Sequence, residues 1–458
     1  MAPRCKEPNR RLAELMAEVG LSQKGLASRV VRLGERRGSA ALRYNHSSVA
    51  RWLRGELPRD PAPDLIAEVL SVELGRQITA AEAGMRTREV SGDVGLEIST
   101  SQGGGVDVLN SLVEADRGGR RRILGSDVDP AACASAALRW LVGPWDTSPA
   151  APAGGRRIGA AEVEEIRQVA SAFRVLDNRL GGGQVRSPVA DYLHSRVVPL
   201  LREARCSEEV RRGLFSAAAD LTKLAAWIHH DLDRQGMAQR YLIQALGMAR
   251  HAGDQGLGGE ILAAMSQQAH YLALPDRAVD LARAGQVAAG RAGMPVLMTE
   301  CQVMEAHGYA AQKQARACAL ALTRAETTYD QTGSGDASPE WLDYFDEAYY
   351  AARIAHCFRE LENGAETQRY ALKSLAMNPT YRRGKVFNVS ILAQSLAVQG
   401  EVEEACVEGR RAVDLAGGIS SQRVYRYIGE VHRALEPYCA EPVVAAFTQY
   451  AGERLHAP

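Results

Sequence analysis

The side chains that could do catalytic or metal chemistry are most concentrated between His229 and Asp233, where the chain reads HHDLD. Imidazole and carboxylate groups bind zinc and exchange protons, so His229, His230, Asp231 and Asp233 have the composition of such a site. Neighbouring residues on a helix point about 100° apart, however, and the HExxH spacing that aligns two imidazoles is missing. We therefore expect these groups to be hydrogen-bonded or solvent-facing, with no metal and no other cofactor.

Other patterns also argue against an enzyme. The glycines at 181–183 lack the Gly-Lys-Ser/Thr ending and the preceding strand of a phosphate-binding loop, which favours a helix terminator or hinge. The eight cysteines have no close pair with the spacing of a zinc or redox motif. The remaining single histidines are expected to pack rather than bind metal: His194, His270, His307 and His356. No catalytic residue is predicted.

DNA recognition is the chemistry that the amino-terminal residues fit best. In HSSVARWLRGELP, which begins at His46, helical spacing places apolar residues on one side and Ser47, Ser48, Arg51 and Arg54 on the other. Arginine can bind guanine O6 and N7 in a bidentate contact that contributes about 1–3 kcal/mol of discrimination. We expect Arg51 to contact bases in this way and Arg54 to contact phosphate.

Neighbouring segments offer side chains for the DNA backbone. Gln23 and Lys24 open the preceding helix, whose amino terminus already favours phosphate. Further candidates for backbone or minor-groove contacts are Arg36, Arg37, Arg43, Tyr44 and His46. Trp52 has core spacing and is expected to fill the space between helices.

Short amphipathic helices must position these groups. Apolar spacing predicts helices over 9–20, 23–33, about 46–54 and 62–74, and Ser22 is placed to cap the second of them. The distribution of charge also indicates that the amino-terminal region, called the head below, binds DNA. Met1 to Arg59 holds 13 basic and 5 acidic residues, although the chain has 55 of each. A cationic head on an anionic body is expected when only the head meets a polyanion.

Composition sets the fold class. The 458 residues suit two to four domains, and 46% hydrophobic with only 6% aromatic residues favours an all-α protein. The start of the sequence shows no leader peptide, and no apolar run reaches about 18 residues, so we expect a cytoplasmic protein that does not interact with membranes.

Beyond the head, the sequence predicts a linker and then repeats. Glycine, serine and threonine over 91–105, and glycine and proline over 143–155, predict a linker with short helical segments across 91–159. From residue 160 pairs of helices recur with a period near 40, and a small residue near the start of each second helix serves as the anchor of its unit. One further unit fits between the second and third anchors. Small residues mark the units: Ala238, Ala278, Ala365 and Ala405. Such units stack into a solenoid.

Two family resemblances follow from these residues. LSQKGLASRV, beginning at Leu21, and HSSVARWLRGELP resemble the helix-turn-helix of the Xre/Cro-repressor-like DNA-binding family. About fourteen residues, 32–45, stand where that family has a tight turn, which indicates a longer second helix or a wing. The repeats resemble tetratricopeptide repeats, best over 399–416. The whole layout is similar to actinobacterial regulators of development and antibiotic production, and it weakly implies repression.

The concave face of such a solenoid binds peptides, proteins or small molecules. Candidate inner residues are polar or aromatic: Tyr241, Gln267, Gln268, Tyr271, Tyr309, Tyr344, Tyr349, Tyr350, Asn388 and Tyr425. The tyrosines among them could equally be half-buried between helices.

Together these observations predict an all-α chain with a helix-turn-helix domain (1–90), a linker (91–159) and a tetratricopeptide-like α-solenoid (160–458). The predicted function is sequence-specific regulation of transcription on double-stranded DNA. A homodimer would place two heads on half-sites ~34 Å apart, and the repeats would bind a peptide, protein or small-molecule effector. The alternative is a repeat-based adaptor for proteins or peptides that binds no specific operator.

Overall fold

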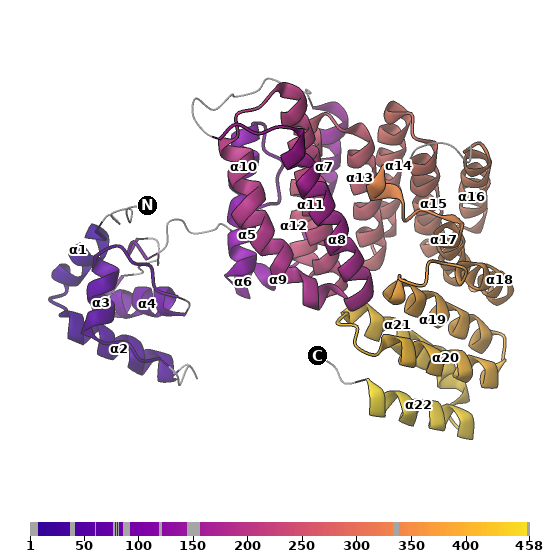
Figure 1. Ribbon diagram of the computed structural model, residues 1–458. Coiled ribbons are helices and arrows are strands. Elements are labelled where there is room, and N and C mark those ends of the chain that lie inside the picture. Colours follow the sequence, from indigo (N-terminus) through magenta and orange to yellow (C-terminus); the bar gives the residue numbers. More distant parts are fainter. Residues whose placement is uncertain are drawn as a thin grey trace. The chain divides into compact units, whose positions relative to one another are not determined.

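The structure is a computed structural model that describes residues 8–36, 42–59, 61–76, 78, 80, 82–85, 92–118, 121–143, 156–332 and 339–455. Across these residues the chain is helical and forms no β-strand, apart from one isolated bridge between Arg157 and Arg205. The all-α prediction is confirmed (Figure 1). The chain divides into two units, Met1–Ser91 and Gly92–Pro458. None of the described helices combines the length and apolar composition needed to cross a bilayer.

Four helices build the first unit: α1 (Arg10–Glu18), α2 (Gln23–Arg36), α3 (His46–Leu53) and α4 (Ala62–Leu74). All four predicted helices are therefore present, and α2 is the longer helix that the insertion indicated. Their apolar faces meet in one core that contains Leu12, Leu26, Val49 and Trp52. The Asn9 side chain donates to the carbonyls of Ala83 and Gly84, which ties the end of this unit to the start of α1.

Caps fix where the two central helices begin. The amide of Gly25 donates to Ser22 Oγ at 3.1 Å, as the predicted cap requires. Asn45 caps α3 through a reciprocal pair, in which its side chain accepts from the Ser48 amide and Ser48 Oγ accepts from the Asn45 amide. Because α3 has only eight residues, this cap satisfies a large share of its free backbone donors.

The described part of the second unit contains five helix pairs that follow one another. Their first helices are α11 (Glu208–Asp231), α13 (Gln255–Tyr271), α15 (Pro295–Ala311), α17 (Glu347–Glu360) and α19 (Arg382–Val398). Their second helices are α12 (Gln235–Ala252), α14 (Pro275–Ala292), α16 (Ala315–Asp330), α18 (Gly364–Ser374) and α20 (Val402–Ala416). Successive helices pack in a solenoid-like order, as the repeat pattern predicted.

One backbone conformation recurs in the turn inside every pair. The residue with positive φ is Asp233, Ala273, Lys313, Glu362 or Gly400. Five residues later a buried side chain occupies the fourth position of the second helix: Ala238, Ala278, Cys318, Thr367 or Ala405. The predicted extra unit is therefore α15–α16. The predicted anchor Ala365 is wrong, because it is exposed and Thr367 takes the buried position two residues later.

The region predicted as a linker differs in the structure. Helices α5 (Gln102–Arg117), α6 (Arg121–Leu124) and α7 (Pro130–Val142) belong to the second unit and pack on α12 and α14. The glycine run that suggested a flexible tether forms the first turn of α5, where the Ser101 hydroxyl caps the Gly104 amide. Trp140 of α7 is fully buried against Gly258. Small residues here allow close packing rather than flexibility.

Further helices flank the repeats at both ends. Before α11 lie α8 (Ala160–Leu180), α9 (Gly182–Tyr192), a π-helical turn η1 (Leu193–Val197) and α10 (Val198–Glu203). After α20 come α21 (Gln422–Leu435), the short η3 (Glu436–Tyr438) and α22 (Pro442–Arg454), and η2 (Glu340–Leu342) precedes α17.

The two ends of the second unit meet. The amide of Ser420 donates to the Leu180 carbonyl at 2.8 Å, and the amide of Gly183 donates to the Ser420 carbonyl at 3.1 Å. Gly181 ends α8 with φ +83°, and a Cβ there would lie 2.4 Å from the Ser420 carbonyl oxygen. The three glycines are thus a helix terminator, as predicted, at a close approach between distant segments. The solenoid closes on itself around a cavity.

Candidate functional site

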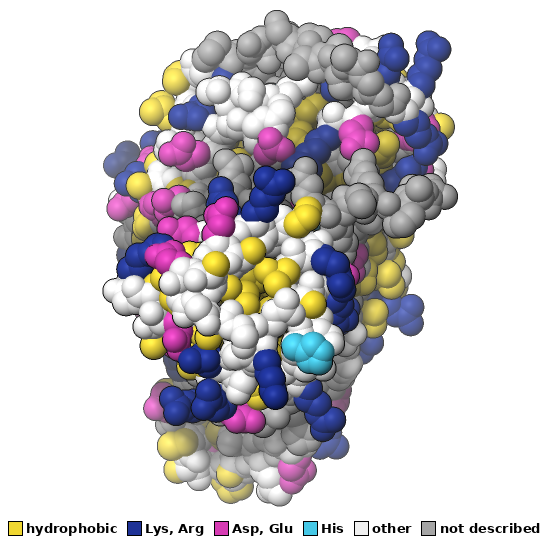
Figure 2. All heavy atoms as spheres, turned by 90° about the vertical axis from the view of Figure 1, so that its left-hand side faces the viewer, with side chains coloured by type: hydrophobic (Ala, Val, Ile, Leu, Met, Phe, Trp, Pro, Cys, Tyr) yellow, Lys and Arg dark blue, Asp and Glu magenta, His cyan; other side chains and the backbone are white. Residues whose placement is uncertain are grey.

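The exposed side of α3 is the first candidate site. His46, Ser47, Arg51 and Arg54 are all exposed at or next to this helix, whereas Trp52 is 5% exposed and lies in the core as predicted. Within the described part of this unit, no carboxylate lies within ion-pair distance of Arg51 or Arg54. In Figure 2 Lys and Arg side chains are scattered over the face that forms the left-hand side of Figure 1. This surface can therefore offer two free guanidinium groups to an anion.

Two of the predicted DNA contacts on this helix need correction. Ser48 is 5% exposed, and its hydroxyl is engaged with Asn45 in the cap, so it does not face outward with Ser47. Tyr44 is half-buried and packs edge-on against Trp52 with ring centroids 5.2 Å apart, which makes it part of the core wall. Both errors arise because the sequence did not reveal which short polar side chains serve the cap and which aromatic residue closes the core.

The remaining predicted contacts lie on neighbouring elements. Gln23 and Lys24 are exposed at the start of α2, and Arg36 and Arg43 are exposed on either side of the segment that joins α2 to α3. Arg37 lies outside the described residues. Arg29 is different, since its Nε forms a 2.7 Å ion pair with Glu73 of α4.

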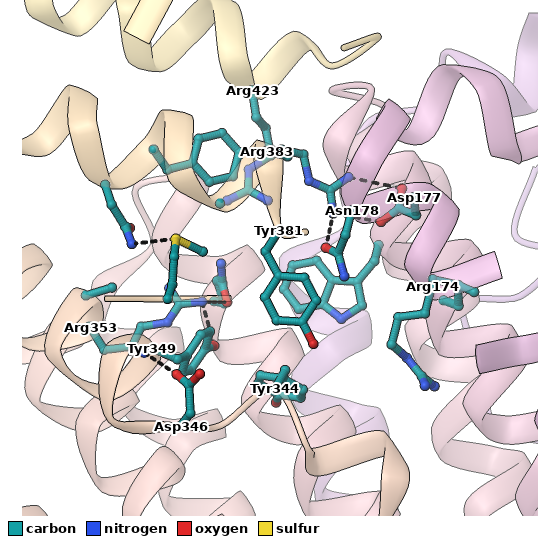
Figure 3. A pocket seen from close by; sticks show the side chains of 18 of the residues that line it. Arg174, Asp177, Asn178, Tyr344, Asp346, Tyr349, Arg353, Tyr381, Arg383 and Arg423 are labelled. Carbon is teal, nitrogen blue, oxygen red and sulfur yellow. Dashed lines mark hydrogen bonds and ion pairs between the residues drawn. The ribbon is translucent and has the colours of Figure 1, made fainter. Parts of the chain in front are cut away.

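The cavity enclosed by the repeats is the second candidate site (Figure 3). Its volume is about 220 Å³, and side chains from α8, α11, α13, α17, α19 and α21 line it. In Figure 3 Arg353 and Arg174 lie on opposite sides, with Tyr381 between them. Aromatic residues form much of the wall: Trp227, Trp341, Tyr344, Tyr349, Tyr381, Phe387 and Tyr427.

The predicted inner residues divide into three groups. Gln267, Asn388 and two of the tyrosines, Tyr344 and Tyr349, line the cavity. Tyr241 and Gln268 are buried in the helix packing, where Tyr241 donates to Asp116 and Gln268 donates to the Gln235 carbonyl. The others lie elsewhere: Tyr271 lines an adjacent cavity, Tyr309 bonds to Arg283 on α14, and Tyr350 stacks on Tyr329.

Most charges in the cavity wall are paired. Arg383 forms ion pairs with Asp177 at 2.7 Å and Asp231 at 3.1 Å, and Lys223 pairs with Glu260 at 2.8 Å. Arg174 pairs with Asp220 at 2.7 Å. Each pair joins residues from different helices, so the wall is held in place electrostatically.

Sequence reasoning missed the arginines of this cavity, although one signal was present. Arg353 lies in α17 at a fixed distance along the chain before the turn residue with positive φ. At the same distance before their own turn residues, the first helices of the other pairs have Leu224, Ala264, Met304 and Ile391. Those four are buried and apolar. An arginine at a core position of a repeat indicates a polar interior at that level.

An acidic pair lies beside the cavity. The Tyr344 hydroxyl donates to Glu300 at 2.8 Å and also lies 3.2 Å from Glu260. Burial, together with the charge of Glu260, raises the pKa of Glu300 to about 7. Burial also raises the pKa of Glu260, although Lys223 opposes that shift. Two carboxyl groups this close, with little access to water, favour the protonated form of one of them.

Three histidines stack along the adjacent cavity. His270 and His307 have ring centroids 3.5 Å apart, and His307 and His356 5.4 Å apart. Burial lowers the pKa of His270 to about 4 and the pKa values of the other two well below 6.5, so all three are neutral at pH 7. The ligand atoms of His270, His307 and Glu360 lie within 4.8 Å of one another, close enough for these residues to hold a metal ion.

The HHDLD group does not converge, as expected. His229 bonds to Asp116 at 2.9 Å, and His230 bonds to Gln235 at 2.9 Å. Asp231 accepts from the Gly182 amide and the Ser421 hydroxyl. Asp233 accepts from Gln235, which is also the partner of His230, so these side chains are held by helix packing and do not converge on one point.

Comparison with known proteins adds one match. Residues 12–86 match the family described as the SP15 N-terminal domain, a range that lies within the first unit. No curated protein and no solved structure matches the chain. The matched family therefore covers the helices that carry the α3 surface and leaves the repeat unit without a named relative.

Proposed function

We propose that the protein is a cytoplasmic, sequence-specific DNA-binding regulator of transcription whose repeat unit binds an effector. The observation that carries this proposal is the exposed side of α3, where Arg51 and Arg54 project without carboxylate partners among the described residues. Arginine on a short helix that fits the major groove is the usual means of reading guanine. The basic excess of the first 59 residues, 13 against 5, supplies the attraction to phosphate.

Two further features support the proposal. The α2–α3 residues resemble the Xre/Cro-like helix-turn-helix, and the joined layout resembles actinobacterial regulators, which favours repression of genes for development or antibiotic production. A single small head binds DNA only modestly. We therefore propose a homodimer that sets two α3 helices ~34 Å apart on a two-fold symmetric operator.

Selection of bound fragments from the native genome with the full chain tests the proposal. We expect one enriched, partly palindromic sequence, which the protein protects from cleavage in the presence of competitor DNA. Arg51→Ala should weaken binding to that sequence about tenfold or more and change binding to random duplex little, because a base contact carries the sequence discrimination. Affinity is measured by mobility shift over a series of salt concentrations.

Arg76→Ala is the matched control, since Arg76 is an exposed arginine at the end of α4 that pairs with Glu18 and lies outside the α3 surface. It should leave the specific affinity within about twofold. If Arg51→Ala lowered the affinity for specific and for random DNA equally, Arg51 would contact phosphate rather than a base. Failure to enrich any sequence, together with capture of a protein by the repeats, would favour the adaptor alternative.

A further inference from the structure

Two guanidinium groups in the repeat cavity form no direct ion pair within the described residues. Arg423 of α21 is 8% exposed, and within the described residues it has neither a hydrogen bond nor an ion pair. Its guanidinium carbon lies 4.7 Å above the ring of Phe387. Arg353 of α17 donates only to the neutral groups Gln267 Oε1 and Tyr349 Oη, each at 2.7 Å. The Nε atoms of both arginines are buried without an acceptor.

The nearby acids are already engaged with other groups. Asp177 and Asp231 bind Arg383, and Glu260 binds Lys223. Glu300 reaches Arg353 only through the Tyr349 hydroxyl, which lies 3.3 Å from its carboxylate. Arginine stays protonated in proteins, and burying an unpaired charge is costly. Both guanidiniums line the cavity without a carboxylate in direct contact among the described residues, so each can bind an acidic group that enters the cavity.

The side chains around the two arginines indicate which chemical group the ligand carries besides its anion. Arg353 and Arg423 line both the cavity of about 220 Å³ and an adjacent one of about 360 Å³, which also share Gln267, His356 and Tyr427. Phe387 and Tyr427 stack with centroids 4.4 Å apart beside the two arginines. Trp227, Trp341 and Tyr381 continue the aromatic surface. Flat aromatic groups stack well on such a wall.

We infer that Arg353 and Arg423 form an anion-binding site for an organic acid with an aromatic body, which is the effector of the repeat unit. The acidic group lies between the two guanidiniums and accepts from their N–H groups, and the body lies against the aromatic wall. This inference rests on the proposed function, because the ligand is an effector only if the protein regulates transcription. The binding test uses no DNA, so it can fail or succeed independently of operator recognition.

A pair of fluorescent probes with one aromatic skeleton tests the site on the full chain. 8-Anilinonaphthalene-1-sulfonate carries an anion, and N-phenyl-1-naphthylamine lacks it. We expect one saturable sulfonate site per chain. Arg353→Met and Arg423→Met should each weaken sulfonate binding about tenfold or more, because a charge-assisted hydrogen bond is lost, and should change binding of the neutral probe less than about twofold.

Arg411→Met is the matched control, since Arg411 is an exposed arginine of α20 paired with Glu408. It should bind both probes as the wild type does. Without ligand, Arg423→Met should lower the Tm by no more than about 2 °C, because Arg423 forms no direct ion pair within the described residues. Equal losses of both probes, unchanged sulfonate affinity, or a Tm lowered by several degrees in Arg423→Met would overturn the inference.

Competition for the bound sulfonate distinguishes the sources of such an acid. Displacement by indole-3-acetate but not by indole-3-acetamide supports a small free acid. Displacement by acetyl-Gly-Gly-Trp but not by its carboxy-terminal amide supports the carboxylate of a peptide. Displacement by acid and amide alike would contradict recognition of the anion.

Discussion

At the scale of single residues, the interior of the repeat unit changes the protonation of Glu300. The side chain is 3% exposed and shares its surroundings with Glu260, Tyr344, Tyr349, Lys223 and Arg353. Burial and the neighbouring Glu260 together outweigh the hydrogen bond from Tyr344 and the two cations, so the pKa rises from 4.5 to about 7. Folding therefore favours the protonated form of this carboxyl group.

The consequence is a pH-dependent stability that Glu300→Gln should remove. Below about pH 4.5 the carboxyl is protonated in both states and its contribution to stability is complete. As pH rises from 4.5 to about 7 the unfolded chain loses the proton first, and stability falls by up to about 3 kcal/mol. We expect Glu300→Gln to be more stable than wild type at pH 8 and equal to it near pH 5.

Urea unfolding at a series of pH values measures this difference. Glu403→Gln, at an exposed position of α20, serves as the control and should follow the wild type at every pH. A difference between Glu300→Gln and wild type that does not change with pH would show that folding does not shift the pKa of Glu300.

At the scale of elements, helix boundaries follow from local chemistry. Apolar spacing predicted α1 to α4, and the Ser22 cap is present. The repeats were found because each turn and each buried small residue recur together. The error in the repeats was local too: Ala365 lies two residues before Thr367, which takes the buried position that the turn geometry defines. A sequence pattern shows which residue types recur but not their exact register.

The cap of α3 gives a prediction at this scale. Asn45→Ala removes the acceptor for the Ser48 amide, which lies 3.1 Å from Asn45 Oδ1. We expect a loss of about 0.5–2 kcal/mol in the stability of α3, together with weaker DNA binding, because an eight-residue helix depends strongly on its cap.

Hydrogen–deuterium exchange of residues 46–53 measures the opening of α3 directly. Ser47→Ala is the control: it alters the exposed neighbour of Ser48 and should leave the exchange rates nearly unchanged. Faster exchange in both variants, or in neither, would mean that the Asn45 cap does not stabilise this helix.

At the scale of the whole second unit, closure of the solenoid determines its stability. Arg383 bonds to Asp177 across 206 residues of chain, and Asp231 receives a hydrogen bond from Ser421 across 190. These groups are buried and lie within hydrogen-bond distance, so the guanidinium and the carboxylates compensate one another's charge. The same contacts hold α8 and α11 against α19 and α21, the helices that enclose the cavity.

Arg383→Met should therefore be strongly destabilising. The change leaves Asp177 and Asp231 buried without their cation, which costs about 3–5 kcal/mol. Thermal unfolding should show a lower Tm for the second unit. Arg382→Met is the control, because Arg382 donates to the carbonyls of Leu415 and Gly417 and has no carboxylate partner. Similar Tm values for both variants would show that the ion pairs do not stabilise the closed form.

The features that were predicted correctly depend on neighbours along the chain. They include the helical class, the four head helices, the period of the repeats and the basic character of the head, because apolar spacing, caps and charge are local properties. Sequence reasoning also placed Gln267, Tyr349 and Asn388 in a cavity. Recognition of DNA remains a prediction that rests on the same local pattern.

Contacts between distant side chains depend on the packing of the helices in three dimensions. The glycine-rich start of α5 forms a helix that packs against α12, and the Ser48 side chain faces inward because it completes the cap with Asn45. The unpaired Arg353 and Arg423 became visible once closure of the solenoid showed that every nearby acid already has a partner. Charge balance is a property of three-dimensional neighbours, which spacing along a chain does not specify.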